Sequence, residues 1–261
     1  MRSLGLLALV VLASCGATSG DDHVDAGAPS PIGTGARIRE IGDPSRSDHP
    51  KNLANVSVTG AAVVWVDTFD ETGNGKSRGT VYVQDVGSQE AFSGISLYSP
   101  TFIPGDLRVA PGDVLDLAGQ YQENDHIGTA IFPAGQVLPQ ISKPISTFRY
   151  EFQPPDPKEV DVNELDDYAK GRKWLGMLVT VKNVTLTDDL DDEGLKKQSA
   201  PTGRVTAHLT SNRGGAKMTN ELYALPGGTL KAGSRISSLT GIVTYFYELH
   251  IAPRSAADVV Q

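Results

Sequence analysis

Two acidic, glycine-containing segments are the places where this chain comes nearest to a metal-binding pattern. In a calcium loop, oxygen-bearing side chains occupy positions one, three and five, a glycine makes the turn at position six, and a glutamate occupies position twelve. The matching residues are Asp70, Thr72, Asn74 and Gly75 in the first segment, and Asp189, Asp191, Glu193 and Gly194 in the second. Position twelve is Val81 or Ala200, so half of the usual ligand set is missing. Because hairpin tips are commonly polar, we expect solvated turns, with Ca²⁺ binding as the alternative and no other cofactor.

The sequence contains no catalytic motif. Its five histidines are scattered and lack the short spacing of zinc ligands. No Gly-x-Ser-x-Gly segment is present to hold a nucleophilic serine. The segment "GNGKS" ends like a phosphate-binding loop, but Asp70 stands where the first glycine is required. We therefore expect a protein that is not an enzyme.

The pattern around these residues predicts β-structure. Short segments that are β-branched or alternating in polarity are separated by Gly, Pro and Asp. The first five predicted strands lie in "NVSVTGAAVVWVD", "GTVYVQD", "SGISLYS", "GDVLDLAGQYQE" and "IGTAIFPAG". The first, second, fourth and fifth of these recur later as "GMLVTVKNVTLTD", "GRVTAHLTS", "KAGSRISSLTGIVTYF" and "LHIAPRS". The shared order and similar spacing indicate a duplicated domain.

Composition divides the chain into five parts. Residues 1–14 read as a signal peptide, and residues 15–52 as a flexible tether because they are rich in small and polar residues. The two copies of the repeat occupy residues 53–140 and 164–261. Between them, Pro154, Pro155 and Pro157 predict a Pro-rich linker over residues 141–163.

The strand segments quoted above resemble the OB-fold-like modules of bacterial secreted proteins and lipoproteins. In some predicted extracellular nucleases, similar modules precede a metal-dependent nuclease domain. The resemblance implies an all-β fold of two tandem five-stranded OB-like barrels, each small and partly open. Two unrelated sandwich domains are the alternative. The shared motifs specify a fold and not a reaction.

The OB resemblance also implies a ligand surface, which is the face of strands two and three with the adjoining loops. Alternation along the strands directs Val81 and Val83 inward and leaves Tyr82 and Tyr98 outward, with His208 in the corresponding place of the second copy. Exposed tyrosines could stack on sugar rings or bases. Packing of these tyrosines against the linker or the other domain is the interpretation that we favour.

Net charge disfavours nucleic acid as a partner. Residues 56–138 hold 3 Lys and Arg against 10 Asp and Glu, a net charge of −7, whereas residues 164–261 hold 12 against 11, a net charge of +1. An acidic surface repels a polyanion. Any nucleic-acid site would lie in the second copy, where Arg204, Arg213 and Lys217 flank the second predicted strand.

The N-terminal segment "MRSLGLLALVVLASC" predicts secretion. Its apolar run from Leu4 to Leu12 is far shorter than the roughly 20 residues that span a bilayer. The sequence from Leu12 to Cys15 resembles the lipobox of bacterial lipoproteins, which implies that Cys15 carries a lipid and attaches the protein to a membrane. Cys15 is the only cysteine in the chain, so no intramolecular disulfide can form. Gly16 follows it in place of the Asp of inner-membrane lipoproteins, which favours the outer membrane.

These observations together predict a non-catalytic surface lipoprotein of the bacterial cell envelope. Its two OB-like barrels would bind a protein or glycan partner, or act as a spacer. The alternative is an oligonucleotide-binding accessory protein that acts through the second copy.

Overall fold

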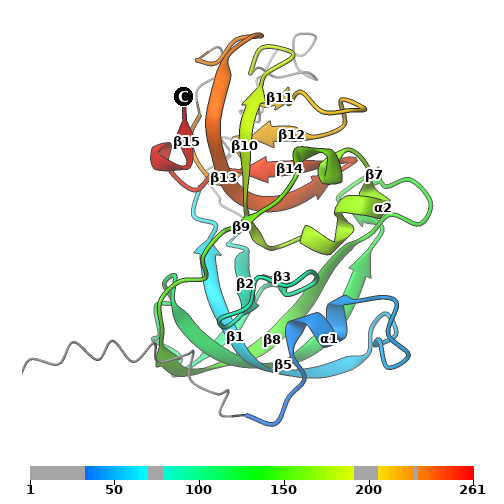
Figure 1. Cartoon of the computed structure of the whole chain (residues 1–261). Coiled ribbons are helices and arrows are strands. Elements are labelled where there is room, and N and C mark those ends of the chain that lie inside the picture. The colour runs from blue at the N-terminus through cyan, green and yellow to red at the C-terminus, as the bar shows by residue number, and fades with distance from the viewer. Residues whose placement is uncertain (1–32, 70–78, 191–204, 226–228) are drawn as a thin grey trace, which may run out of the picture.

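The structure, a computed structural model, describes residues 33–69, 79–190, 205–225 and 229–261. Within these ranges the chain is mostly β-strand with a few short helices, as the sequence predicts. Two sheets form the body of the molecule, and Figure 1 shows one at each end of it. None of the described helices is long and apolar enough to cross a membrane.

The first sheet curves into a barrel, here called barrel 1. Its strands are β1 (Asn55–Val66), β2 (Val81–Asp85), β3 (Gly94–Tyr98), β5 (Asp113–Asn124) and β8 (Leu138–Glu151). They pair in the order β3-β2-β1-β5-β8, and parallel pairing of β3 with β8 joins the two ends. A short strand, β4 (Thr101–Ile103), adds to β8. Apolar side chains that alternate along these strands, such as Val81, Val83 and Leu97, fill the interior.

The second sheet, here called barrel 2, has the same order of strands when each sheet is followed around its closed ring. Its strands are β10 (Leu178–Thr185), β11 (Thr206–His208), β12 (Lys217–Thr219), β13 (Arg235–Phe246) and β14 (Glu248–Ala252). They pair in the order β11-β12-β14-β13-β10, and a bridge between Leu186 and Leu209 brings the two ends together. Short strands β9 (Lys158–Glu159) and β15 (Val259–Val260) extend the sheet beside β10 and β13.

Several short helical elements surround barrel 2. They are η1 (Val162–Leu165), α2 (Tyr168–Gly171), η2 (Arg172–Trp174) and η3 (Ala256–Asp258), and each contains a buried residue. Trp174 is buried in the core of barrel 2, and Trp65 packs against the contact between the barrels.

The fifth strand of barrel 1 is not where the sequence places it. The segment around residues 127–135 forms only a small hairpin, β6 (His126–Ile127) with β7 (Ala130–Ile131). The partner of β5 is instead β8, whose residues 141–151 lie in the predicted linker. Pro139 and Pro144 and a positive φ of 46° at Lys143 interrupt the alternation that would have revealed this strand. The long edge of β5 nevertheless requires a partner, and β8 supplies it.

Residues 33–52 also differ from the predicted tether. Ala36 bridges to Val58, and the helix α1 (Ile38–Gly42) places Ile38 and Ile41 in the core of barrel 1. The buried carboxylate of Asp85 accepts hydrogen bonds from the backbone N–H of Ile38 at 2.8 Å and of Arg39 at 3.0 Å. Two isoleucines spaced three residues apart are too weak a pattern to predict so short a helix, but they cover apolar atoms of barrel 1 that water would otherwise reach.

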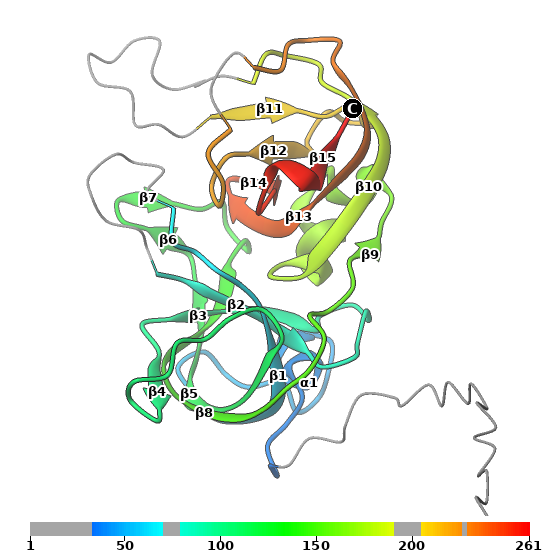
Figure 2. The ribbon, with the colours of Figure 1, turned by 90° about the vertical axis from the view of Figure 1, so that its left-hand side faces the viewer.

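The two barrels contact each other through an apolar interface. Val64 and Tyr82 of barrel 1 form one buried cluster with Leu178, Leu222, Ile242 and Ala252 of barrel 2. Beside this cluster, the Gln84 side chain accepts a hydrogen bond from the backbone N–H of Leu178 at 3.2 Å. Figures 1 and 2 show the barrels stacked one upon the other in two perpendicular views. The interface fixes which surfaces of the two barrels face each other.

Candidate functional site

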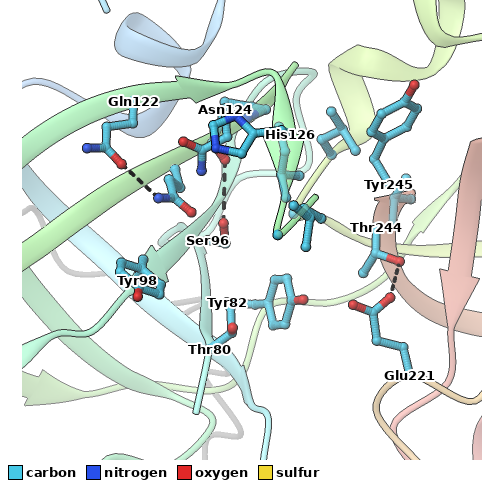
Figure 3. Close-up of a pocket in the computed structure, with 18 residues that line it drawn as sticks. Thr80, Tyr82, Ser96, Tyr98, Gln122, Asn124, His126, Glu221, Thr244 and Tyr245 are labelled. Atoms are coloured by element: carbon cyan, nitrogen blue, oxygen red, sulfur yellow. Dashed lines mark hydrogen bonds between the residues drawn. The ribbon is translucent and has the colours of Figure 1, made fainter. Parts of the chain in front are cut away.

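A cavity of about 520 Å³ lies between the two barrels. This volume is within the roughly 300–1,000 Å³ that is usual for small-molecule pockets. Barrel 1 contributes residues of β2, β3, β5, β6 and the start of β8, and barrel 2 contributes residues of β13 and of the segments around Leu175 and Glu221. We refer to it as the inter-barrel cavity; Figure 3 shows its labelled lining residues.

The barrel 1 wall begins with the outward side chains of β2 and β3. Because successive side chains alternate across a sheet, Tyr82, Ser96 and Tyr98 point away from the barrel core and line the cavity. Tyr82 is 7% exposed because barrel 2 covers it, whereas Tyr98 is 53% exposed. Tyr98 therefore stands at the mouth of the cavity and Tyr82 lies deeper inside it.

Three side-chain amides continue this wall. Gln122 and Asn124 lie on β5, and Gln140 lies opposite Gln122 on β8. The Gln140 amide donates to the Gln122 Oε1 atom at 2.9 Å. The Asn124 amide makes no side-chain hydrogen bond within the part of the chain that the structure describes. Asn124 thus offers a donor and an acceptor to a ligand.

Barrel 2 forms the deep wall with buried polar side chains. Glu221 and Thr244 are 5% and 4% exposed, and the Thr244 hydroxyl donates to the Glu221 Oε2 atom at 2.8 Å. The Tyr245 hydroxyl donates to the side-chain oxygen of Gln136. Burial, with Tyr168 as the next contribution, raises the pKa of Tyr245 to about 12. The phenol therefore stays protonated at neutral pH and presents no negative charge to a ligand.

The chemistry of the lining is polar but short of positive charge. None of the described residues that line the cavity is Lys or Arg. Hydroxyl groups, side-chain amides and aromatic rings predominate, with apolar side chains such as Leu138 and Val243 between them. Among the described residues, no three His, Cys, Asp or Glu side chains are grouped so that they could hold a metal ion. The arrangement is suited to binding an uncharged, hydroxyl-rich molecule.

The structure separates the two predicted ligand tyrosines from the predicted residues of the second copy. Tyr82 and Tyr98 both line the cavity, although Tyr82 packs against barrel 2 and is not exposed. His208 lies elsewhere, where its Nδ1 atom is 2.7 Å from the Asp188 carboxylate. Tyr82 thus packs against the other domain, as the favoured interpretation of the sequence predicts, whereas Tyr98 stays half exposed.

The predicted basic cluster is largely neutralised. The Arg213 guanidinium is 2.9 Å from the Asp167 carboxylate, and the Lys217 ammonium is 2.6 Å from the Glu248 carboxylate. Lys217 is only 6% exposed, so it cannot contact a phosphate at the surface. Arg204 lies outside the described residues. Within the described part of this cluster, Lys217 is buried and the exposed Arg213 is paired with a carboxylate.

Most of the predicted calcium ligands also lie outside the described residues, namely Asp70, Thr72, Asn74, Asp191 and Glu193. Asp189 is described, and its carboxylate accepts hydrogen bonds from the Lys231 ammonium at 3.1 Å and from the Ala232 backbone N–H at 2.9 Å. Asp189 therefore has a local structural role at a turn. The lipidation residue Cys15 is outside the described residues too.

Sequence reasoning missed the amides and the barrel 2 wall. Gln120 and Gln122 alternate with the buried Tyr121 on one predicted strand, and Asn124 directly follows its end, which is a signal that the outward face of that strand is amide-rich. The sequence predicts that Gln140 ends the first domain just before a linker, so it gives no sign that Gln140 pairs with Gln122. Glu221 and Thr244 come from the other barrel, far along the chain from Tyr98, and no local pattern connects them with it.

Comparisons with known proteins identify no relative of this chain. No family model, no curated protein and no solved structure matches the chain. What the inter-barrel cavity binds must therefore be argued from its own chemistry.

Proposed function

We propose that this protein is a non-catalytic binding protein of the bacterial cell envelope, that its two barrels are OB-like modules, and that its ligand is a neutral glycan. The observation that carries the proposal is the inter-barrel cavity, which is lined by tyrosines, side-chain amides and hydroxyls and has no Lys or Arg among its described lining residues. A well-formed pocket with convergent polar groups is the usual place for a ligand to bind.

The lining complements the surface of a sugar. A sugar ring presents hydroxyls around its edge, each of which can donate and accept hydrogen bonds, and apolar C–H groups on its faces. Asn124 and Gln140 can donate and accept at the same time, and Tyr98 offers a half-exposed aromatic face to the C–H groups. An anionic glycan or a phosphate would find no positive charge among these residues to offset its desolvation.

A glycan array followed by isothermal titration calorimetry tests this proposal. We expect the purified chain to bind neutral oligosaccharides, and we expect Asn124→Ala and Tyr98→Ala each to weaken binding about five- to tenfold, since each removes roughly 1–1.4 kcal/mol of contact. Tyr247→Ala is the matched control, because Tyr247 is 44% exposed and does not line the cavity. The proposal fails if no neutral glycan binds, or if both cavity variants bind as tightly as the wild type.

The oligonucleotide alternative has less support. It depends on Arg204, Arg213 and Lys217, and the two of these that the structure describes are paired with carboxylates. Fluorescence anisotropy with a labelled single-stranded oligonucleotide, at low and at near-physiological salt, distinguishes the alternatives. Binding that falls steeply with salt and is lost on charge reversal at Arg213 would favour the alternative, because counterion release dominates binding to nucleic acids.

The envelope location rests on the resemblance of the segment ending in Cys15 to a lipobox. We propose that Cys15 carries the lipid and holds the barrels at the outer membrane. Mass spectrometry of the detergent-extracted protein checks this directly. An unmodified Cys15 that is still preceded by residues 1–14 would contradict the proposal.

A further inference from the structure

The polar groups of the inter-barrel cavity continue outside it, along the outer face of barrel 1. Gln120, Gln122 and Asn124 occupy every second position of this part of β5 and lie on one face. Tyr121, which stands between Gln120 and Gln122, is fully buried. Gln122 and Asn124 line the cavity, but Gln120 does not. Since two residues of a strand span about 6.8 Å, the amides extend about 14 Å from Asn124 to Gln120.

Neighbouring strands widen this polar surface. Gln140 of β8 pairs with Gln122, and Ser142 of β8 pairs with Gln120. On the other side of β5, Asn55 of β1 also pairs with Gln120. Tyr98 of β3 pairs with Ser142, so the ring at the cavity mouth belongs to the same row as Gln120. We call Gln120, Gln122 and Gln140 the amide track.

The amides of the track are ordered before any ligand arrives. Gln140 donates to the Gln122 oxygen at 2.9 Å, and the Gln122 amide donates in turn to the Gln120 oxygen at 3.3 Å. Figure 3 shows the first of these bonds beside the cavity. Each amide nitrogen has a second hydrogen that this chain of bonds does not use. Fixing three long side chains in advance lowers the entropy that a ligand would lose in ordering them.

The backbone beneath the track is not available to a ligand. Strand β5 pairs with β1 on one side and β8 on the other, and β8 pairs with β3 as well as β5. A peptide could therefore not add itself as a further strand at this place, which is the usual way in which an extended peptide binds a sheet. Recognition must come from side-chain amides and hydroxyls, and these suit a chain of sugars.

We infer that the ligand is a linear neutral oligosaccharide longer than the cavity, with its inner end beside Asn124 and Tyr82 and its outer units along the amide track past Tyr98. This inference rests on the proposed function and adds the length and path of the ligand. The cavity and the track would act as successive subsites for one chain.

Calorimetry with glycans of increasing length tests the inference. The probes are neutral gluco-, chito- and manno-oligosaccharides from the disaccharide to the hexasaccharide. For the series that binds, we expect affinity to rise by at least about tenfold from the shortest to the longest member. Gln120→Ala should weaken hexasaccharide binding by about five- to tenfold, because it removes up to two hydrogen bonds, and should leave disaccharide binding unchanged.

Two further variants keep the outcomes distinct. Asn124→Ala should weaken binding at every length, and Gln89→Ala, an exposed glutamine in the loop between β2 and β3, should change nothing. Affinity that does not depend on length, or that Gln120→Ala leaves intact for the hexasaccharide, would overturn the inference. If Asn124→Ala still weakens binding in that case, the proposed function stands without it. If no series binds, the proposed function fails first.

Discussion

Gly94 offers a sharp test of how the two barrels form the cavity, because it lies where their backbones touch. A Cβ atom built on Gly94 would lie 2.5 Å from the Met177 backbone nitrogen and 2.6 Å from the Gly176 carbonyl carbon. Gly176, on the other side of the contact, has a φ of 74°, and a Cβ built on it would lie 2.7 Å from the Ile95 backbone nitrogen. Neither neighbour is a flexible side chain that could turn aside.

The cost of Gly94→Ala follows from these distances. Carbon atoms in favourable contact are about 3.5–4.0 Å apart, so the barrels must separate by about 1 Å at this point. Overpacking of this kind costs about 1–3 kcal/mol. Gly176 and Leu175 line one side of the cavity, and Ser96, two residues from Gly94, lines the other. The separation should therefore also misplace the two walls and lower the affinity for a glycan.

Urea denaturation and calorimetry measure the two effects. Gly105→Ala is the matched control, since a Cβ at Gly105 would have no atom within 4 Å and the position has no positive φ. We expect the control to change the free energy of unfolding by less than about 0.5 kcal/mol. If Gly94→Ala is as stable and binds as tightly as Gly105→Ala, then the barrels do not meet as described.

Two further predictions concern the N-terminal segment and the deep wall. Replacing Asp85 by Ala leaves the backbone N–H groups of Ile38 and Arg39 without acceptors, so we expect a loss of about 2–4 kcal/mol and faster hydrogen exchange over residues 33–52. Slow exchange in that variant would contradict the role given to Asp85. Because the pKa of Tyr245 is raised to about 12 from its ordinary value near 10, its contribution to stability is complete below pH 10 and is lost as pH rises from 10 to 12. Urea midpoints between pH 9 and 12 should fall less steeply in Tyr245→Phe, and equal slopes would refute this.

The strands of the barrels show which structural features the local sequence pattern predicts. Alternation correctly predicts that Val81 and Val83 face inward and that Tyr82 and Tyr98 face outward, because side-chain direction along a strand is set by the two-residue repeat. It does not reveal β8, in which two prolines and a residue of positive φ disrupt that repeat. Alternation also does not predict α1. This helix is stabilised by the burial of Ile38 and Ile41 in barrel 1 and not by its own helix propensity.

The candidate site also depends on tertiary contacts that the sequence pattern does not contain. The sequence indicates aromatic residues on an outward face, but exposure depends on what covers that face. Barrel 2 covers Tyr82 and leaves Tyr98 open, and the carboxylates of Asp167 and Glu248 pair with Arg213 and Lys217. Charge counts cannot show such pairing, because a count does not contain distances.

The sequence is enough to predict the β-rich fold, the recurrence of strand segments and the inward or outward direction of most strand residues, since each depends on neighbours along the chain. It does not reveal which strand completes barrel 1, that Ile38 and Ile41 belong to its core, or that a cavity forms between the barrels. These features arise from contacts between segments far apart in sequence. The walls that carry Asn124 and Thr244 meet only because the apolar faces around Val64 and Ile242 are buried together.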